Sequence, residues 1–277
     1  MYDKKVNIGD AYIHHGKAND RVYLMKLGNE DPNEIMDKIE QLAEENDYTK
    51  IQVKIPEDAA SPFLERDYIQ EAKVPGFYNG ETTGLFLSKF IDEERAKEKK
   101  PQRVKEVIEA SLAKKTGSFT PELDDGYMWK VAEEADAQHL TEVYKVVFET
   151  YPFPIHDPDY IIETMRENIV YFCAMKDDKI IAVSSSEMDR NASNVEMTDF
   201  ATIPDHRGHG IAVFLLKKME EEMRKLGIKT AYTIARSYSF GMNITFAKLN
   251  YSFAGTLVSN TNISGGMESM NIWYKPL

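Results

Sequence analysis

The chain has 277 residues, of which 42% are hydrophobic, so it can form one large domain or two modest ones with apolar cores. Its formal net charge of −12 argues against nucleic acid and anionic membranes as partners and suits a small cationic substrate. The single cysteine, Cys173, excludes an internal disulfide and a cysteine metal cluster. We find no signal-peptide pattern and no apolar run long enough to span a bilayer, and we therefore expect a cytoplasmic protein.

Residues 1–91 are predicted to form a small α/β domain. Asp31 as N-cap and Pro32 as the first helical residue mark the start of a helix, and a shorter helix is expected at 58–66. Apolar segments rich in β-branched and aromatic residues predict four strands, at 21–27, 50–55, 68–76 and 83–90. The predicted order is therefore β-α-β-α-β-β.

Residues 92–125 are rich in charge and are predicted to be a linker between two domains. Within the linker, Val104, Val107, Ile108 and Leu112 recur at helical spacing, which predicts a surface helix.

Residues 126–277 are predicted to form a second, larger α/β domain. The expected strands lie at 127–133, 169–176, 179–188, 195–203, 229–234, 251–259 and 268–275. The expected helices lie at 135–149, 158–168, 209–226 and 239–249.

One loop of this second domain has the character of an anion site. The segment Arg207-Gly208-His209-Gly210-Ile211-Ala212 lies between the strand that ends at Ile203 and a long amphipathic helix. Two glycines allow a tight turn and close approach of a ligand to the backbone. The free N–H groups and the positive dipole end of the following helix then attract an anion.

The spacing [Q/R]-x-x-G-x-[G/A] of this loop, together with the order of elements over 126–277, resembles the GNAT superfamily of N-acetyltransferases. The resemblance implies a mixed-sheet α/β fold and an enzyme that uses acetyl-CoA. The order over residues 1–91 matches the second half of that fold, so we interpret it as a degenerate half-copy; an unrelated small α/β domain is the alternative. In that half-copy Leu27-Gly28-Asn29-Glu30 stands where the glycine loop would be, so we expect it to bind no CoA.

The resemblance also implies which residues bind the cofactor. The central strand is expected to separate from its neighbour just before the loop, so that its free backbone groups bind the pantetheine arm and one N–H polarises the thioester. The cofactor-binding residues implied are Phe200, Ala201 and Thr202 on the strand, Arg207, Gly208, His209, Gly210, Ile211 and Ala212 at the pyrophosphate, and Asn243 at the pantetheine arm.

Two residues are assigned to catalysis by the same resemblance. Glu196 is expected to be the general base, with Asp199 as the competing carboxylate. A regular strand would place Glu196, Thr198 and Phe200 on one face and Met197, Asp199 and Ala201 on the other. The position of the usual tyrosine that protonates the leaving thiolate is occupied by Phe246, so Tyr238 is the candidate for that role.

Two polar or aromatic stretches are candidates for substrate contact. The first runs from Tyr151 to His156 and contains Phe153, which makes a rigid apolar lip for an alkyl-amine chain. The second, predicted as the turn between the last two strands, spans 260–271 and contains Asn262 and Glu268, which could bind an amino acid. Ordinary turns with incidental polarity are the alternative interpretation of both.

With these stretches, the short first domain and Phe246, the chain is similar to the superfamily members that acetylate the ε-amine of β-lysine to make a neutral osmolyte. A GNAT enzyme that acetylates another small amine, such as a polyamine, lysine or an aminoglycoside, is an alternative that stays open. A sensor that binds acyl-CoA without turnover also stays open. The histidines lack metal-ligand spacing, so we expect no metal, and a homodimer is compatible with the sequence.

Overall fold

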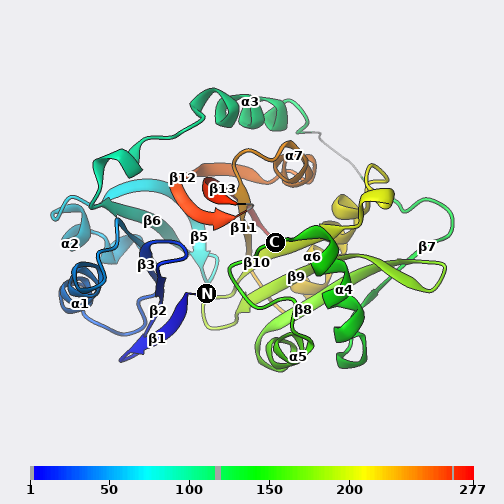
Figure 1. Ribbon diagram of the computed structural model, residues 1–277, viewed down its shortest axis with the longest axis horizontal. Helices are drawn as coiled ribbons and strands as arrows, with labels where there is room; N and C mark the ends of the chain where they lie inside the picture. The colour runs from blue at the N-terminus through cyan, green and yellow to red at the C-terminus, as the bar shows by residue number, and fades with distance from the viewer. Residues whose placement is uncertain (1–2, 116–119, 264) are drawn as a thin grey trace.

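The computed structural model describes residues 3–115, 120–263 and 265–277. Residues 116–119 of the predicted linker and Ser264 of the predicted polar turn lie outside these ranges. The strands of the described residues form one mixed sheet of 13 strands in the order β1-β2-β3-β4-β6-β5-β12-β13-β11-β10-β9-β8-β7 (Figure 1). The predicted α/β class with a mixed sheet is confirmed. None of the helices within the described ranges is long and apolar enough to cross a membrane.

The C-terminal half contains the expected elements with small shifts at their ends. Its strands are β7 (Tyr127–Val131), β8 (Ile169–Lys176), β9 (Lys179–Asp189), β10 (Asn194–Thr202), β11 (Thr230–Arg236), β12 (Ser252–Ile263) and β13 (Gly266–Pro276). Its helices are α4 (Ala137–Val147), α5 (Pro158–Glu167), α6 (Ile211–Lys225) and α7 (Phe240–Lys248). One apolar core lies between the sheet and α6 and α7, and a second lies between the sheet and α4 and α5, so helices cover both faces.

The N-terminal half has two strands that the sequence pattern missed. Its strands are β1 (Lys4–Ile8), β2 (Ala11–Gly16), β3 (Arg21–Lys26), β4 (Lys50–Pro56), β5 (Ile69–Tyr78) and β6 (Thr82–Phe90). Its helices are α1 (Pro32–Glu45) and the single turn α2 (Ser61–Leu64), so the helix expected at 58–66 is shorter than predicted. The strands β1 and β2 are short and carry lysines and histidines, which masked their alternation.

The two halves have matching strand orders. In the N-terminal half β3 is parallel to β4, which is followed by β6 and then β5, both antiparallel to their neighbours. In the C-terminal half β10, β11, β13 and β12 are arranged in the same way. The hairpin β1–β2 precedes β3 as β8–β9 precedes β10. Descent of the N-terminal half from a GNAT copy stays an interpretation, which this order supports.

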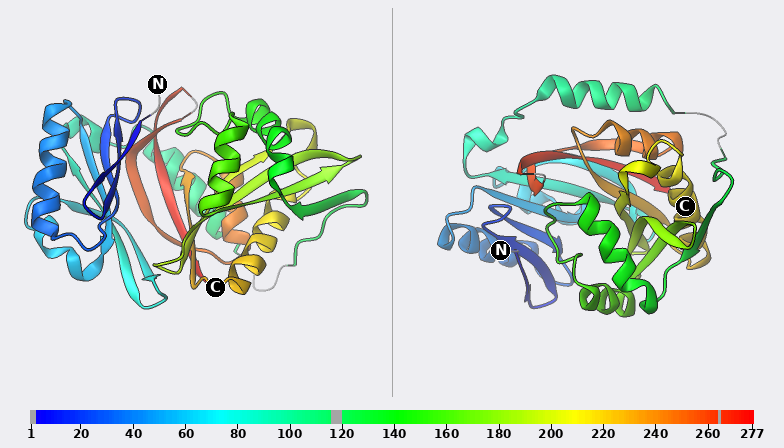
Figure 2. Two further views of the ribbon diagram at one scale, coloured as in Figure 1. Left: turned by 90° about the horizontal axis from the view of Figure 1, so that it is seen from below. Right: turned by 45° about the vertical axis from the view of Figure 1, so that its right-hand side comes forward.

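The halves join where β5 meets β12, at the pair Ala72 and Gly255. A Cβ on Gly255, whose φ is +150°, would lie 2.0 Å from the Glu71 carbonyl oxygen, so only glycine permits this approach. A core cluster that includes Phe77, Phe86, Tyr232 and Ile272 draws on both halves. The helix α3 (Pro101–Leu112) of the predicted linker runs outside the sheet and packs on α7 (Figures 1 and 2).

Candidate active site

The central strand β10 separates from β11 after three paired residues. The parallel register joins only residues 194–196 to 230–232, although both strands continue. On its other side, the register of β10 with β9 shifts between Thr198 and Ala201, and Asp199 there has a φ of +55°. A β-bulge of this kind bends a strand and frees backbone groups from the ladder. The central strand therefore separates from its neighbour before the glycine loop, as expected from the sequence.

The bulge overturns the expectation that Glu196 and Asp199 lie on opposite faces. Glu196, Thr198 and Asp199 line the same cavity. Phe200 instead packs edge-on against Phe246 in the core below α6 and α7, with ring centroids 5.6 Å apart. The extra residue at the bulge reverses the alternation of side chains between the two faces of β10. Both candidate carboxylates therefore face the cleft.

The glycine loop leads into α6 with an uncapped N-terminus. Gly210 is the N-cap with a φ of +70° and no side chain that could bind the first-turn N–H groups. A Cβ on Gly208 or Gly210 would meet nothing within 4 Å, so the space above the loop is open. The Arg207 Nε donates to the Thr202 carbonyl at 3.0 Å, and His209 Nδ1 lies 2.7 Å from an Asp124 oxygen. The free N–H groups at the start of α6 are therefore available to an anion at this loop.

The equivalent helix of the N-terminal half is closed to anions. The Asp31 carboxylate caps α1 by accepting from the N–H groups of Asn33 and Glu34. Glu30 beside it accepts from the Asp10 N–H at 2.8 Å. A carboxylate at this position satisfies the helix dipole and repels a phosphate. This geometry supports the expectation that residues 1–91 bind no CoA.

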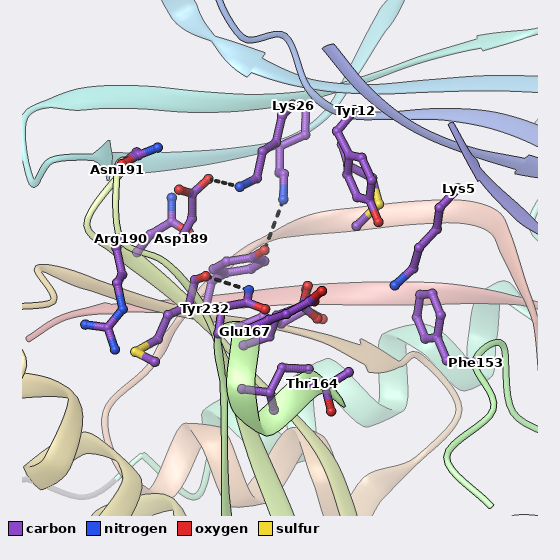
Figure 3. Close-up of a pocket in the computed structure, with 18 of the residues that line it drawn as sticks. Lys5, Tyr12, Lys26, Phe153, Thr164, Glu167, Asp189, Arg190, Asn191 and Tyr232 are labelled. Atoms are coloured by element: carbon purple, nitrogen blue, oxygen red, sulfur yellow. Dashed lines mark hydrogen bonds and ion pairs between the residues drawn. The ribbon is translucent and has the colours of Figure 1, made fainter. Parts of the chain in front are cut away.

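A cleft of two connected cavities lies between the N-terminal strands and β8–β10. The inner cavity has a volume of about 120 Å³ and the outer one of about 570 Å³. Glu187, Glu196, Phe153 and Tyr160 line both. In the outer cavity, side chains of the N-terminal half such as Lys5 and Tyr12 point toward Phe153 (Figure 3).

Three carboxyl groups on the C-terminal side of the cleft have perturbed acidity. Burial, reinforced by the neighbouring Glu187, raises the pKa of Glu196 to about 8, although Lys54 and a hydrogen bond from Tyr232 act in the opposite direction. Burial likewise raises the pKa of Glu187 and of Asp199. Asp199 accepts hydrogen bonds from Ser185 Oγ at 2.5 Å and from the Tyr151 hydroxyl. Such a cluster can bind ammonium groups and accept a proton near neutral pH.

Of the predicted substrate residues, Tyr151 and Phe153 line the inner cavity. Asn262 and Glu268 line neither cavity. The backbone N–H of Asn262 donates to Asn19, and Glu268 accepts from Arg236 Nη2 at 2.9 Å. Of the residues predicted as a turn, 260–263 and 266–271 are strand, because β12 and β13 extend as a long hairpin that reaches the N-terminal half.

The structure gives Asn243 and Tyr238 other partners. The side chain of Asn243 is buried and makes four hydrogen bonds, to Arg236 and Ser239 carbonyls and from Asn271 and Trp273. The Tyr238 hydroxyl donates to Glu98 at 2.5 Å, next to α3. Among the described residues, no group of three His, Cys, Asp or Glu side chains is placed to hold a metal ion.

Sequence reasoning missed the cleft residues of the N-terminal half. Lys54 on β4 is 8% exposed, and its Nζ donates to the Tyr232 hydroxyl at 3.1 Å. Arg21 and Tyr23 on β3 are also buried and line the inner cavity. The available signal was a charged residue inside an apolar strand, as in Val53-Lys54-Ile55, which requires a buried partner.

Comparison with known proteins agrees with this geometry. The model of the acetyltransferase (GNAT) family matches residues 138–243. The chain is 40% identical over 275 residues to the β-lysine N(6)-acetyltransferase of Methanococcus maripaludis, covering 99% of this chain and 98% of that protein. The chain belongs to the GNAT family of acetyltransferases.

Two other relatives of this GNAT protein are N-acetyltransferases by name. It is 30% identical to the N-acetyltransferase YodP of Bacillus subtilis, over 96% of each chain. It is 41% identical over 155 residues to the β-lysine N(6)-acetyltransferase of Methanosarcina mazei, over 56% of this chain and 57% of that one. Among solved structures, the ribosomal-protein-S18-alanine N-acetyltransferase of Escherichia coli covers 54% of this chain and 93% of its own, with 16% identity and a TM-score of 0.48.

Proposed function

We propose that this GNAT enzyme transfers the acetyl group of acetyl-CoA to the ε-amine of β-lysine, giving CoA and Nε-acetyl-β-lysine. The full-length similarity to a β-lysine N(6)-acetyltransferase supports the acceptor. The structural observation that carries the proposal is the position of Glu196 and Asp199, which line the inner cavity beside the gap between β10 and β11. A cationic amine bound there lies next to the position where the thioester would enter.

The reaction we propose is a direct attack within a ternary complex. Glu196 accepts a proton from the ε-ammonium, and the free amine attacks the thioester carbonyl carbon to form the C–N bond. Free backbone N–H groups after the bulge stabilise the negative oxygen, and the C–S bond then breaks. The N-terminus of α6 binds the pyrophosphate. The nitrogen then loses its second proton, which a water molecule passes to the leaving thiolate, because Phe246 has none to donate and the Tyr238 hydroxyl is engaged with Glu98.

A thiol-release assay with β-lysine, α-lysine and spermidine at equal concentration tests the acceptor. We expect the highest kcat/KM with β-lysine, and an acetyl group on the ε-nitrogen in the product by tandem mass spectrometry. Preferred turnover of spermidine would instead assign a polyamine acceptor. Binding of acetyl-CoA without thiol release from any amine would indicate an acyl-CoA sensor and contradict the proposal.

Two further expectations belong to the same proposal. A reaction that consumes acetyl-CoA is expected in the cytoplasm, which fluorescence microscopy of a tagged chain would check. A homodimer is compatible with the sequence, and the molar mass in solution by light scattering would decide the assembly.

A further inference from the structure

The inner cavity has two walls of opposite chemistry. The wall contributed by the C-terminal half carries the carboxyl groups of Glu187, Glu196 and Asp199. The wall contributed by the N-terminal half carries hydrogen-bond donors, the side chains of Arg21 and Tyr23 among them. A cavity built this way is complementary to a molecule with ammonium groups at one end and an anionic group at the other.

Arg21 is the unusual member of the donor wall because it is buried without an anionic partner. Its side chain is 6% exposed, and no carboxylate of the described residues forms an ion pair with it. One terminal nitrogen donates to Gln52 Oε1 at 3.2 Å and to the Asn260 carbonyl oxygen, while Nε has no partner among the described residues. Burying a guanidinium without a counter-ion is costly, so a ligand anion is the natural complement.

Two residues near Arg21 also have buried polar atoms without a hydrogen-bond partner among the described residues. The Tyr23 hydroxyl and His14 Nε2 are buried and have no hydrogen-bond partner in the described part of the chain, and both residues line the cavity with Arg21. Burial lowers the pKa of His14 to about 4, so the ring is neutral at pH 7 and one of its nitrogens can donate. The ring stacks on Phe153, with centroids 5.2 Å apart, which fixes it at the cavity wall.

Resting on the proposed function, we infer that Arg21, with Tyr23 and His14, binds the carboxylate of the amino-acid acceptor. A guanidinium presents paired N–H groups that match a carboxylate, and a phenol hydroxyl supplies a further donor. The acidic wall then receives the ammonium groups. The N-terminal half thus selects acceptors that carry a carboxylate and discriminates against diamines and polyamines, which carry none.

The test compares β-lysine with 1,4-diaminopentane, which is β-lysine without its carboxylate. We expect the unmodified enzyme to prefer β-lysine by about 100-fold in kcat/KM, because the diamine leaves the Arg21 guanidinium unpaired. In Arg21→Gln, kcat/KM should fall about 100-fold for β-lysine, mainly through KM, and stay within about threefold for the diamine.

Two variants make this test independent of folding defects. Tyr23→Phe removes only one hydroxyl and should raise the KM for β-lysine several-fold without changing that for the diamine. Arg95→Gln is the matched control, because Arg95, at the start of the predicted linker, is also a buried arginine but pairs with Asp20 at 3.3 Å and lines neither cavity. It should lower the melting temperature without altering the preference between acceptors.

The outcomes separate the two proposals. Equal kcat/KM for both acceptors in the unmodified enzyme, or equal losses on both acceptors in Arg21→Gln and Tyr23→Phe, would overturn the role of Arg21 while leaving acetylation of β-lysine intact. Failure of the unmodified enzyme to turn over β-lysine would overturn the proposed function, and the carboxylate site with it.

Discussion

The Lys54 ammonium donates a hydrogen bond to the Tyr232 hydroxyl across the boundary between the two halves, at 3.1 Å. The Tyr232 hydroxyl is in turn hydrogen-bonded to Glu196. The same Lys54 lowers the pKa of Glu196, whereas burial and Glu187 raise it. A residue of the N-terminal half therefore acts on the acidity of the proposed general base.

The acidity of Glu196 predicts the pH dependence of the reaction. Burial raises the pKa of Glu196 to about 8, so the base form is lost as pH falls below that value, and kcat/KM should rise with pH toward about 8. Glu196→Gln should remove this limb and leave only the titration of the amine itself, near pH 10. A profile that keeps the limb near pH 8 in Glu196→Gln would assign the base elsewhere, with Asp199 the next carboxylate.

Replacing Lys54 should move the same limb. Lys54→Met removes a positive charge that favours the ionised carboxylate, so the apparent pKa of Glu196 should rise. If that pKa rises by about one pH unit, kcat/KM at pH 7 should fall about tenfold, because a tenth as much of the base form remains. Lys26→Met is the control, because Lys26 lines the outer cavity but pairs with Asp189 at 2.9 Å. A pH profile of Lys54→Met that superimposes on that of the unmodified enzyme would contradict this coupling.

A carboxylate at Gly210 should abolish binding of acetyl-CoA. Gly210→Asp places a negative charge at the N-terminus of α6, where it competes with the pyrophosphate, and isothermal titration calorimetry should show a loss of about 100-fold or more in affinity. Gly210→Asn imposes similar backbone strain without the charge and should lose less affinity. Gly227→Asp, at a φ of +80° beyond the other end of the helix, should bind normally. Equal affinity of the Asp and Asn variants at position 210 would argue against a phosphate there.

The Tyr238 hydroxyl should contribute little to the rate. The hydroxyl donates a hydrogen bond to Glu98, next to α3, and we therefore expect Tyr238 to have a structural role. We expect Tyr238→Phe to change kcat by less than about threefold and to lower the melting temperature by a few degrees, because one net hydrogen bond is worth about 1 kcal/mol. Stopped-flow thiol release and calorimetry check the two effects. A loss of about 100-fold in kcat would restore Tyr238 as the general acid.

The contact between the two halves should be sensitive to a single methyl group. In Gly255→Ala the new Cβ would lie 2.0 Å from the Glu71 carbonyl, so the β5–β12 pairing must distort. We expect destabilisation by about 1–3 kcal/mol in urea unfolding, together with a loss of selectivity for β-lysine as the N-terminal wall moves. Gly227 also has a positive φ, of +80°, but open space around it, so Gly227→Ala measures the cost of backbone strain without a steric clash. Equal free energies of unfolding for the two variants would show that the β5–β12 contact tolerates a Cβ at position 255.

The sequence by itself determined the features that depend on local chemistry. The glycine loop, the Asp31 cap and the order of strands and helices from β3 onward follow from backbone freedom, capping and apolar periodicity, all of which act within a few residues. The family resemblance added the expectation that Glu196 is the general base.

Only the tertiary structure decided which side chains share the cleft. The bulge at Asp199 reverses the alternation of β10, and it arises from pairing with β9, the strand that precedes β10 in the chain. The positions of Arg21 and Lys54 depend on β5 meeting β12, a pairing between residues 72 and 255. Contacts between residues this far apart in the chain produce no periodic pattern in the sequence. The partner that stabilises a buried charge is supplied by the other half of the molecule.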